Sequence, residues 1–403
     1  MAEGVHRPAW VEVDLSAIEH NARLLTSIVA PARVCAVVKA DAYGHGAVEV
    51  AEAALAGGAT DLAVAMVDEG VELRDAGVHA PILVLSEPAS DAMAEAFAYR
   101  LTPTLYTPDG IALASEGAGA VGAARWHRPA PVEIKIDTGM HRVGADSKDL
   151  LPLVRGVGQS GKLEFAGLWT HLAVADEPDN GFTLTQLERF EDALKSIAAA
   201  GLPAPGRVHA ANSAGALAWP SSRLDMVRCG IALYGYSPSP ELAGIVASLT
   251  GGERLRPALS MVAKVASVRE LGAGERVSYG LCKPLASRSL VATVPLGYAD
   301  GIPRAYFSSG GSVLLGGRRR PLAGTVTMDQ IMIDCGDDWA VAPGDEVVLI
   351  GSQGGEHLSA EDWARSLETI CYEVVTRIGP RVPRVYSDSK GRITPSATAQ
   401  SGR

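Results

Sequence analysis

The 403-residue sequence lacks the features that would point to a membrane, a nucleic acid or an oxidising compartment. No apolar run approaches the ~18 residues that a membrane-spanning helix needs, and the N-terminal stretch MAEGVHRPAWVEVDL lacks the basic start and apolar core of a secretion signal. The five cysteines form no CxxC pair, so neither a disulfide framework nor a metal site is predicted. The formal net charge of −10 disfavours nucleic acid and anionic lipid as partners. These absences predict a soluble cytoplasmic protein.

The chain shows two different residue patterns, and the first is typical of an α/β domain. From about residue 15 to 235, short apolar runs alternate with longer segments of helical period, which is typical of βα units around a parallel sheet. The apolar runs lie near residues 34–39, 61–66, 81–86, 102–106, 131–137, 165–171, 207–212 and 224–228. Eight runs predict a closed (β/α)8 barrel of the TIM type, which we assign to residues 1–245.

The second residue pattern consists of β-branched stretches interrupted by glycine, and it predicts a mainly β domain at residues 246–388. One helix is expected to interrupt this domain, because Ser359 is followed by AEDWARSLE with a carboxylate in the capping position. The short run before the first helix is surplus to the eight strands, so residues 1–14 are expected to pair with the second domain. Residues 389–403 have little apolar content and are expected to be disordered.

Reactive side chains gather where the apolar runs of the first domain stop. In a (β/α)8 barrel the active site lies at the carboxyl ends of the strands. A single polar residue at such a place is more often a side chain that simply meets solvent. Here six stand in or at the ends of the runs: Lys39, Lys135, His171, Asn212, Ser213 and Arg228. Their number favours a catalytic site.

Lys39 indicates the chemistry of that site. An ε-amine that leaves an apolar strand for the mouth of a barrel can be desolvated, which lowers its pKa and makes the nucleophilic form available. Such a lysine can hold an aldehyde as a Schiff base. The segment ADAYGHG follows it, in which Gly44 and Gly46 let backbone approach a ligand and Tyr43 can donate a hydrogen bond.

The loops after the last two strands indicate a phosphate site. Barrels commonly bind phosphate there through backbone N–H groups. The chain carries the small residues Ser213 to Gly215 after the seventh strand and Cys229 to Ile231 after the eighth. A Schiff-base lysine opposite a phosphate site indicates pyridoxal 5′-phosphate as the cofactor.

Nine motifs along the chain resemble those of alanine racemases and follow the order of that family. They are KADAYGHG (39–46), KIDTGMHRVG (135–144), THLAVAD (170–176), HAANSAG (209–215), MVRCGIALYG (226–235), VSYG (277–280), GYADG (297–301), GTVTMDQIMID (324–334) and TICYEVVTRIGPRVPR (369–384). The resemblance implies a pyridoxal-phosphate-dependent isomerase that interconverts L-alanine and D-alanine by a two-base mechanism. It also implies that the product D-alanine serves cell-wall peptidoglycan.

The same resemblance implies roles for the cofactor-binding residues. Lys39 would carry the Schiff base, and Arg228 would face the pyridine nitrogen. Because a guanidinium does not easily give up its proton, the ring nitrogen would stay unprotonated, which favours reprotonation of the α-carbon over transamination. His171 would lie behind Arg228 and Tyr279 and tune both. The phosphate would be held by Tyr43, Ser213, Gly230, Ile231 and Tyr372, with Asn212 also in the cofactor site.

Two cationic residues would handle the substrate. Arg142 resembles the family arginine that contacts the phenolic oxygen of the cofactor and the substrate carboxylate. Lys135 matches a lysine that many family members carry in carbamylated form. An unmodified buried lysine beside Arg142 would be a like-charge repulsion, so either carbamylation or a bound anion is needed. The sequence leaves both alternatives open.

Four residues of the second domain would reach the barrel mouth of a partner subunit, which implies a homodimer with shared active sites. Tyr279 would be the base that acts on L-alanine, while Lys39 acts on D-alanine. Met328 would bind the substrate carboxylate through its backbone, and Tyr298 would narrow the entrance. Asp329 is placed with them in the substrate site.

Three other functions stay open. The first is a broad-specificity amino-acid racemase on the same barrel. The second is a barrel-type decarboxylase of basic amino acids, which would be expected to place a carboxylate against the ring nitrogen where Arg228 stands. The third is a non-catalytic pyridoxal phosphate carrier, which would end without the β domain and without Tyr279.

Overall fold

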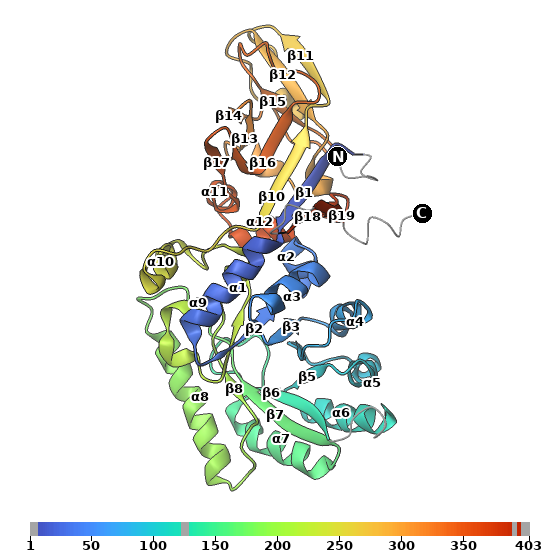
Figure 1. The fold of residues 1–403 in the computed structure, drawn as a ribbon, viewed down its shortest axis with the longest axis vertical. Coiled ribbons are helices and arrows are strands. Elements are labelled where there is room, and N and C mark those ends of the chain that lie inside the picture. Colours follow the sequence, from blue (N-terminus) through green and yellow to red (C-terminus); the bar gives the residue numbers. More distant parts are fainter. Residues whose placement is uncertain (1–6, 122–128, 389–392, 396–403) are drawn as a thin grey trace. The chain divides into compact units, whose positions relative to one another are not determined.

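The structure is a computed structural model that describes residues 7–121, 129–388 and 393–395. The chain forms two compact units (Figure 1). The barrel unit comprises Ala17–Ala42 and Ala47–Arg256, and the β unit comprises Met1–Ser16, Tyr43–Gly46 and Pro257–Arg403. The N-terminal strand and a short segment that follows Lys39 therefore belong to the same unit as the C-terminal part of the chain.

A parallel sheet of eight strands forms the centre of the barrel unit. Its strands are β2 (Arg33–Val37), β3 (Asp61–Val64), β4 (Ile82–Val84), β5 (Thr102–Leu105), β6 (Ala130–Lys135), β7 (Leu163–Trp169), β8 (Val208–His209) and β9 (Met226–Cys229). They are hydrogen-bonded in the order β8-β7-β6-β5-β4-β3-β2-β9. At the join, Asp225 N–H donates to Val208 O at 3.2 Å and Arg228 N–H to Ala211 O at 3.0 Å. The sheet thus nearly closes, and the predicted eight-stranded barrel is confirmed.

Helices alternate with the strands along the chain and surround the sheet (Figure 1). They are α1 (Leu15–Val29), α2 (Lys39–Gly44), α3 (Ala47–Ala56), α4 (Val67–Asp75), α5 (Ser90–Ala98), α6 (Pro108–Val121), α7 (Ser147–Ser160), α8 (Phe182–Ala199), α9 (Ser213–Ala218) and α10 (Ile245–Thr250). Short 3₁₀ turns are η1 (Pro220–Ser222), η2 (Ile231–Tyr234) and η3 (Pro240–Leu242). Phe97 of α5 and Leu150 of α7 belong to one buried cluster with Val132 and Ile134 of β6. This apolar layer between helices and strands fixes the position of β6 and of the polar residues it carries.

The seventh predicted strand is much shorter than residues 207–212. The strand β8 contains only Val208 and His209, because Asn212 already caps the next helix. Its side-chain oxygen accepts a hydrogen bond from Gly215 N–H at 2.9 Å, as expected of a helix N-cap. Asn212 and Ser213 therefore lie in the turn between β8 and α9.

The β unit contains a sheet ordered β14-β13-β16-β10-β1-β18-β19, with β17 paired to β16, and a second sheet ordered β11-β12-β15. The strands are β1 (Ala9–Asp14), β10 (Leu259–Lys264), β11 (Ser267–Leu271), β12 (Ser289–Val294), β13 (Ser312–Leu315), β14 (Arg318–Pro321), β15 (Ile331–Asp334), β16 (Glu346–Gln353), β17 (Glu356–Leu358), β18 (Arg384–Ser387) and β19 (Ile393–Pro395). Strand β1 pairs antiparallel with β10 and parallel with β18. The mainly β character of the second part is confirmed.

Within residues 257–388, two helices, rather than the one predicted, interrupt the strands of the β unit. The predicted helix is α11 (Ala360–Ser366): Ser359 N–H donates to the Asp362 carboxylate at 3.0 Å, and Asp362 N–H donates to Ser359 Oγ at 3.1 Å. The second helix, α12 (Cys371–Thr376), has no side-chain N-cap, so the sequence carries no capping signal for it. Three further 3₁₀ turns are η4 (Tyr279–Leu281), η5 (Tyr298–Asp300) and η6 (Arg304–Tyr306).

The C-terminal stretch expected to be disordered lies mostly outside the described residues, namely 389–392 and 396–403. Within it, Ile393–Pro395 form strand β19, which pairs antiparallel with β18. Over the described ranges, none of the helices is both long enough and apolar enough to cross a membrane.

Candidate active site

Parallel strands bring the predicted site residues of the barrel unit to one end of the sheet. Lys39 follows β2, Lys135 ends β6, His171 follows β7 and Arg228 lies in β9. One direct contact joins two of them, since Arg228 Nη2 lies 3.2 Å from His171 Nδ1. Burial lowers the pKa of His171 well below its ordinary value, and the positive charges of Arg228 and Lys135 lower it further. His171 is therefore neutral at physiological pH and lies within a group of cations.

Lys39 begins a left-handed turn. Ala40, Asp41, Ala42 and Tyr43 all have φ between 51° and 54°, a conformation that costs roughly 1–2 kcal/mol per non-glycine residue. The Glu69 carboxylate holds the start of this turn, accepting hydrogen bonds from Ala40 N–H and Ala65 N–H, both at 2.6 Å. Strain of this kind persists only where surrounding contacts impose it, and it clusters at functional sites.

The amine of Lys39 has a lowered pKa. Burial contributes most to this shift, and the positive charge of Arg142 adds to it. Both effects disfavour the ammonium form. A larger fraction of Lys39 is consequently neutral and nucleophilic near physiological pH than for an exposed lysine, which suits the attack on an aldehyde.

Three acceptors besides His171 hold the Arg228 side chain. Its side chain is almost fully buried and donates from Nη2 to Thr170 O at 2.8 Å and to Ala210 O at 3.0 Å. Nη1 lies 2.6 Å from His209 Nδ1. Burial lowers the pKa of Arg228 to about 10, so the guanidinium still carries its charge at neutral pH. The position and the charge of this group are both fixed.

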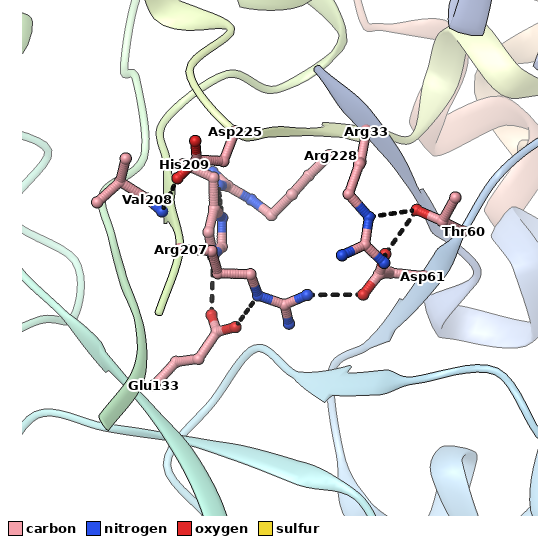
Figure 2. Close-up of polar contacts among 9 residues, drawn as sticks. All are labelled: Arg33, Thr60, Asp61, Glu133, Arg207, Val208, His209, Asp225 and Arg228. Carbon is pink, nitrogen blue, oxygen red and sulfur yellow. Dashed lines mark hydrogen bonds and ion pairs between the residues drawn. The ribbon is translucent and has the colours of Figure 1, made fainter. Parts of the chain in front are cut away.

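The Arg228 contact determines the tautomer of His209. A guanidinium can only donate, so His209 Nδ1 must accept and the ring proton must lie on Nε2. That proton is donated to Glu133 Oε2 at 2.7 Å, and both side chains are fully buried (Figure 2). Burial lowers the pKa of His209 to about 4. The contact is therefore between a carboxylate and a neutral imidazole.

Glu133 keeps its negative charge although burial alone would raise the pKa of its carboxyl. The contacts with His209 and Arg207 outweigh burial and lower this pKa to about 2. Arg207 Nε donates to Glu133 Oε1 at 2.6 Å, and Arg207 Nη1 donates to Asp61 Oδ1 at 2.6 Å (Figure 2). Arg33 Nη2 donates to Asp61 Oδ2 at 2.7 Å. A chain of polar contacts thus runs from Arg228 through neutral His209 to the amino-terminal ends of the strands, and from Glu133 onward its charges alternate.

Lys135 and Trp169 lie beside this chain. Lys135 Nζ lies 4.9 Å from the centroid of the Trp169 ring, and Arg228 Cζ lies 4.6 Å from it. Burial lowers the pKa of Lys135 to about 8, and Arg142 and Arg228 contribute to the shift. No carboxylate forms an ion pair with Lys135 in the part of the chain that the structure describes.

The turn after β8 and the turn after β9 meet at Ser213. Ser213 Oγ accepts a hydrogen bond from Gly230 N–H at 2.9 Å and lies 3.4 Å from the nitrogen of Ala232. The N–H of Ile231, a fully buried residue, has no hydrogen-bond acceptor within the described ranges. A hydroxyl and a free buried N–H at the carboxyl ends of two barrel strands fit a bound phosphate.

The predicted residues of the β unit form two groups. Tyr43 and Tyr372 lie with their ring centroids 6.1 Å apart, and burial raises the pKa of Tyr43 to about 12, so its phenol stays protonated. Tyr298 N–H donates to Thr327 O at 2.9 Å, directly beside Met328. Tyr279, Tyr298 and Met328 are exposed by 69%, 43% and 53%.

Tyr279 and Asp329 extend this second group along the segment 324–329. Ser278, next to Tyr279, donates through Oγ to Thr325 O at 2.6 Å. The Asp329 carboxylate accepts from Arg381 Nη2 at 2.7 Å. Hydrogen bonds of Tyr298 and of Ser278, the neighbour of Tyr279, therefore end on one stretch of backbone that also contains Met328 and Asp329.

Family comparisons match nearly the whole chain. Residues 13–238 match the model of the alanine racemase N-terminal domain, and residues 258–386 match that of the alanine racemase C-terminal domain. The chain belongs to the alanine racemase family. It is 47% identical over 382 residues to the alanine racemase of Symbiobacterium thermophilum, an alignment covering 94% of this chain and 97% of the relative.

Two solved structures of this fold are informative. The crystal structure of the Bacillus anthracis alanine racemase with bound L-Ala-P has a TM-score of 0.88 and 36% identity, covering 96% of this chain and 97% of that one. A histidine racemase from Leuconostoc mesenteroides has a TM-score of 0.82 and 30% identity, covering 95% and 98%. The names of these two structures thus refer to racemases of different amino acids.

Three residues that contact this site have no role predicted from the sequence: Glu69, Glu133 and His209. Only Glu133 carries a usable signal. It stands two residues before Lys135 in an apolar strand, so both side chains lie on the same face of β6. A charged residue on a buried strand face needs a partner. The sequence therefore predicts a buried ion pair at Glu133, but it does not identify the partner residue.

Proposed function

We propose that this protein interconverts L-alanine and D-alanine with pyridoxal 5′-phosphate as its cofactor. One observation carries the proposal: a buried arginine, Arg228, whose charge and orientation are fixed by His209 and Glu133 at the barrel end where Lys39 has a lowered pKa. The curated relatives of similar length are named alanine racemases, which supports alanine as the substrate.

The residues of the barrel unit fit pyridoxal phosphate. Lys39 offers an amine for the aldehyde, Ser213 and Ile231 offer hydrogen bonds for the phosphate, and Arg228 offers a donor for the ring nitrogen. Asn212 fixes the turn that carries Ser213, and Gly230 is held against the same hydroxyl. When bound, the cofactor withdraws electrons from the α-carbon of the amino acid attached to it and so makes the α-proton acidic.

Arg228 limits that electron withdrawal. Its guanidinium keeps its proton, so it donates a hydrogen bond to the ring nitrogen without protonating it. His209 Nδ1 and two backbone carbonyls hold the guanidinium in place. Neutral His171 adds a further acceptor. A weaker electron sink favours return of the proton to the α-carbon over transamination.

Inversion needs a proton donor on each face of the α-carbon. Lys39 Nζ serves the face from which the α-proton of D-alanine leaves, and its lowered pKa makes the amine an effective base. Tyr279 Oη serves the opposite face, for L-alanine. Arg142 holds the substrate carboxylate, and Met328 binds it through its backbone.

Lys135 positions Arg142 in carbamylated form. Because its pKa is about 8, an appreciable fraction of the amine is neutral at physiological pH and can react with carbon dioxide. The negative charge gained would relieve the repulsion among Lys135, Arg142 and Arg228. A bound anion beside Lys135 is the alternative that the same repulsion supports.

The active form is a homodimer in which the β unit of one chain completes the barrel site of the other. The observation behind this is a group of large side chains left in contact with solvent: Tyr279, Leu281, Tyr298 and Met328, exposed by 69%, 55%, 43% and 53%. Exposed apolar groups of this size mark interaction surfaces. In the dimer, Tyr43 and Tyr372 hold the cofactor phosphate, Tyr298 narrows the entrance, and Asp329, paired with Arg381, supports the entrance loop.

The reaction belongs in the cytoplasm, where it supplies D-alanine for peptidoglycan. A broad-specificity racemase is the second candidate, favoured by the structural similarity to a histidine racemase. These two candidate functions are distinguished by incubating the purified protein with each L-amino acid and measuring the D-enantiomer by chiral chromatography. We expect kcat/KM to be highest for alanine; faster racemisation of serine, lysine or histidine would overturn the substrate assignment.

A further inference from the structure

A second cavity lies at the opposite end of the barrel strands from the candidate active site. It has a volume of about 720 Å³ and belongs entirely to the barrel unit. Its wall includes the first residues of β2 and β3, Arg33 and Asp61, and the residue that precedes β8, Arg207. Residues at the starts of parallel strands share the amino-terminal edge of the sheet. This cavity is therefore separate from the cofactor site.

Arginine dominates the charged groups of this wall. Four guanidinium groups line it, from Arg33, Arg74, Arg100 and Arg207, against the carboxylates of Asp61 and Glu164. The whole chain has a net charge of −10, so this concentration of positive charge is local. Local fields decide binding within a cavity because charges farther away than a Debye length, ~8–10 Å, are screened.

Two of these arginines are fixed by one carboxylate and keep donors unused. Asp61 accepts from Arg33 Nη2 through one oxygen and from Arg207 Nη1 through the other. Arg33 Nε donates to Thr60 Oγ1, and Arg207 Nε donates to Glu133. Arg33 Nη1 and Arg207 Nη2 donate a hydrogen bond to no acceptor within the described ranges, and Figure 2 draws both without a contact. Two preorganised donor nitrogens therefore remain at the cavity.

Arg74 carries a charge that no carboxylate balances. It donates to the carbonyl oxygens of Val78, Ala80, Tyr99 and Arg100 at 2.7 to 3.1 Å, and in the described part of the chain it has no ion pair. Burial lowers its pKa, and the positive charge of Arg100 lowers it further. A bound anion would therefore meet, at the cavity wall, a positive charge of Arg74 that no described carboxylate neutralises.

We propose that this cavity binds a multivalent oxyanion. The fork of Arg33 and Arg207 around Asp61 offers one set of donors, and Arg74, which has no ion pair in the described part of the chain, offers positive charge. Guanidinium groups bind phosphate and carboxylate oxygens with paired N–H donors. A ligand with several anionic oxygens, a phosphate ester or a polycarboxylate, matches a cavity of this size whose wall has four guanidinium groups and two carboxylates. The proposal does not depend on the racemase reaction.

The test is isothermal titration of the cofactor-loaded protein at low ionic strength. Loading with pyridoxal phosphate, followed by removal of the free cofactor, keeps the phosphate position near Ser213 occupied, and an unchanged visible spectrum verifies this during the titration. Inorganic pyrophosphate and citrate are the two probes, and acetate is the monovalent control. We expect saturable binding of one pyrophosphate or one citrate per chain, and no saturable binding of acetate. The stronger of the two probes identifies the source of the oxyanion.

Matched variants locate the binding. Arg33→Gln leaves Asp61 paired with Arg207, and Arg100→Gln changes an exposed side chain, so both proteins are expected to fold. Each should weaken binding at least tenfold, by the loss of one guanidinium contact worth about 1.4 kcal/mol. Arg155→Gln removes an exposed arginine of α7 outside the cavity and should change nothing. Absence of saturable binding, or equal affinities for wild type, Arg33→Gln and Arg100→Gln, would overturn the proposal.

Discussion

Glu133 and His209 form a fully buried hydrogen-bonded pair, with Oε2 and Nε2 2.7 Å apart. The carboxylate fixes the proton on Nε2, which leaves His209 Nδ1 as the acceptor for Arg228. The residue proposed to hold the cofactor's ring nitrogen is thus oriented by a carboxylate that contacts it only through an imidazole. Removing that carboxylate tests the arrangement without touching the reacting groups.

Glu133→Gln is expected to lower kcat roughly tenfold, equivalent to about 1.4 kcal/mol, with little change in KM. An amide has one accepting oxygen, so it cannot accept from both Arg207 Nε and His209 Nε2 as the carboxylate does. The orientation of His209, and with it that of Arg228, is then held less firmly. Steady-state kinetics and the pH dependence of the cofactor's visible spectrum are the measurements. Glu188→Gln, an exposed change on α8, is the control. An unchanged kcat and spectrum would limit Glu133 to a role in stability.

The free energy of unfolding is expected to fall as the pH is lowered from about 6.5 to about 4. Burial lowers the pKa of His209 from 6.5 to about 4, so between these values the unfolded chain binds a proton that the folded protein does not. The loss is about 3 kcal/mol at the acid end. His209→Gln removes this contribution and should flatten the slope. Urea unfolding at a series of pH values measures it, and equal slopes would contradict the assignment of a neutral His209.

Lys39→Ala is expected to abolish racemisation and the visible absorbance of cofactor bound through a lysine. Lys135 is a second lysine at this barrel end, but its deeper burial and its contact with Trp169 place it in a different role. Borohydride reduction followed by mass spectrometry identifies the modified lysine in wild type. A reducible adduct that persists in Lys39→Ala protein would move the attachment to another residue.

Arg228→Glu is expected to raise transamination relative to racemisation by about tenfold or more, because a carboxylate stabilises the protonated ring nitrogen and strengthens the electron sink. Pyruvate formed per D-alanine formed is the measured ratio. Arg228→Lys keeps the positive charge and should leave the ratio near the wild-type value. If the ratio stays the same in Arg228→Glu, this arginine does not face the ring nitrogen.

Mixed dimers test whether Tyr279 acts on the partner chain. Lys39→Ala and Tyr279→Phe homodimers should each be inactive, since each lacks one base in both sites. In a mixed dimer one of the two sites regains both bases, so activity should return to up to half of the wild-type value per dimer. Two different affinity tags isolate the mixed species. Mixed dimers that form and remain inactive would place Tyr279 in its own chain's site or exclude it as a base.

The sequence by itself determined the order of elements in the barrel unit and the family. Eight apolar runs predict eight strands because burial on both faces of a parallel sheet needs continuous apolar residues, a signal that is local. The helix after Ser359 was predictable for the same reason, since its cap involves residues three apart. Lys39 and Arg228 were predictable because each stands at a strand end inside a family motif.

Only the tertiary structure decided how the charged residues are paired. Glu133 and His209 are 76 residues apart, and Arg207 and Asp61 are 146 residues apart, so their contacts exist only after the barrel has nearly closed. The left-handed turn after Lys39 is likewise imposed by tertiary contacts such as the Glu69 carboxylate, because the local sequence ADAY has no glycine to favour it. Local sequence sets which segments become strands and helices, whereas buried polar groups take whichever partners the closed sheet places within hydrogen-bond distance.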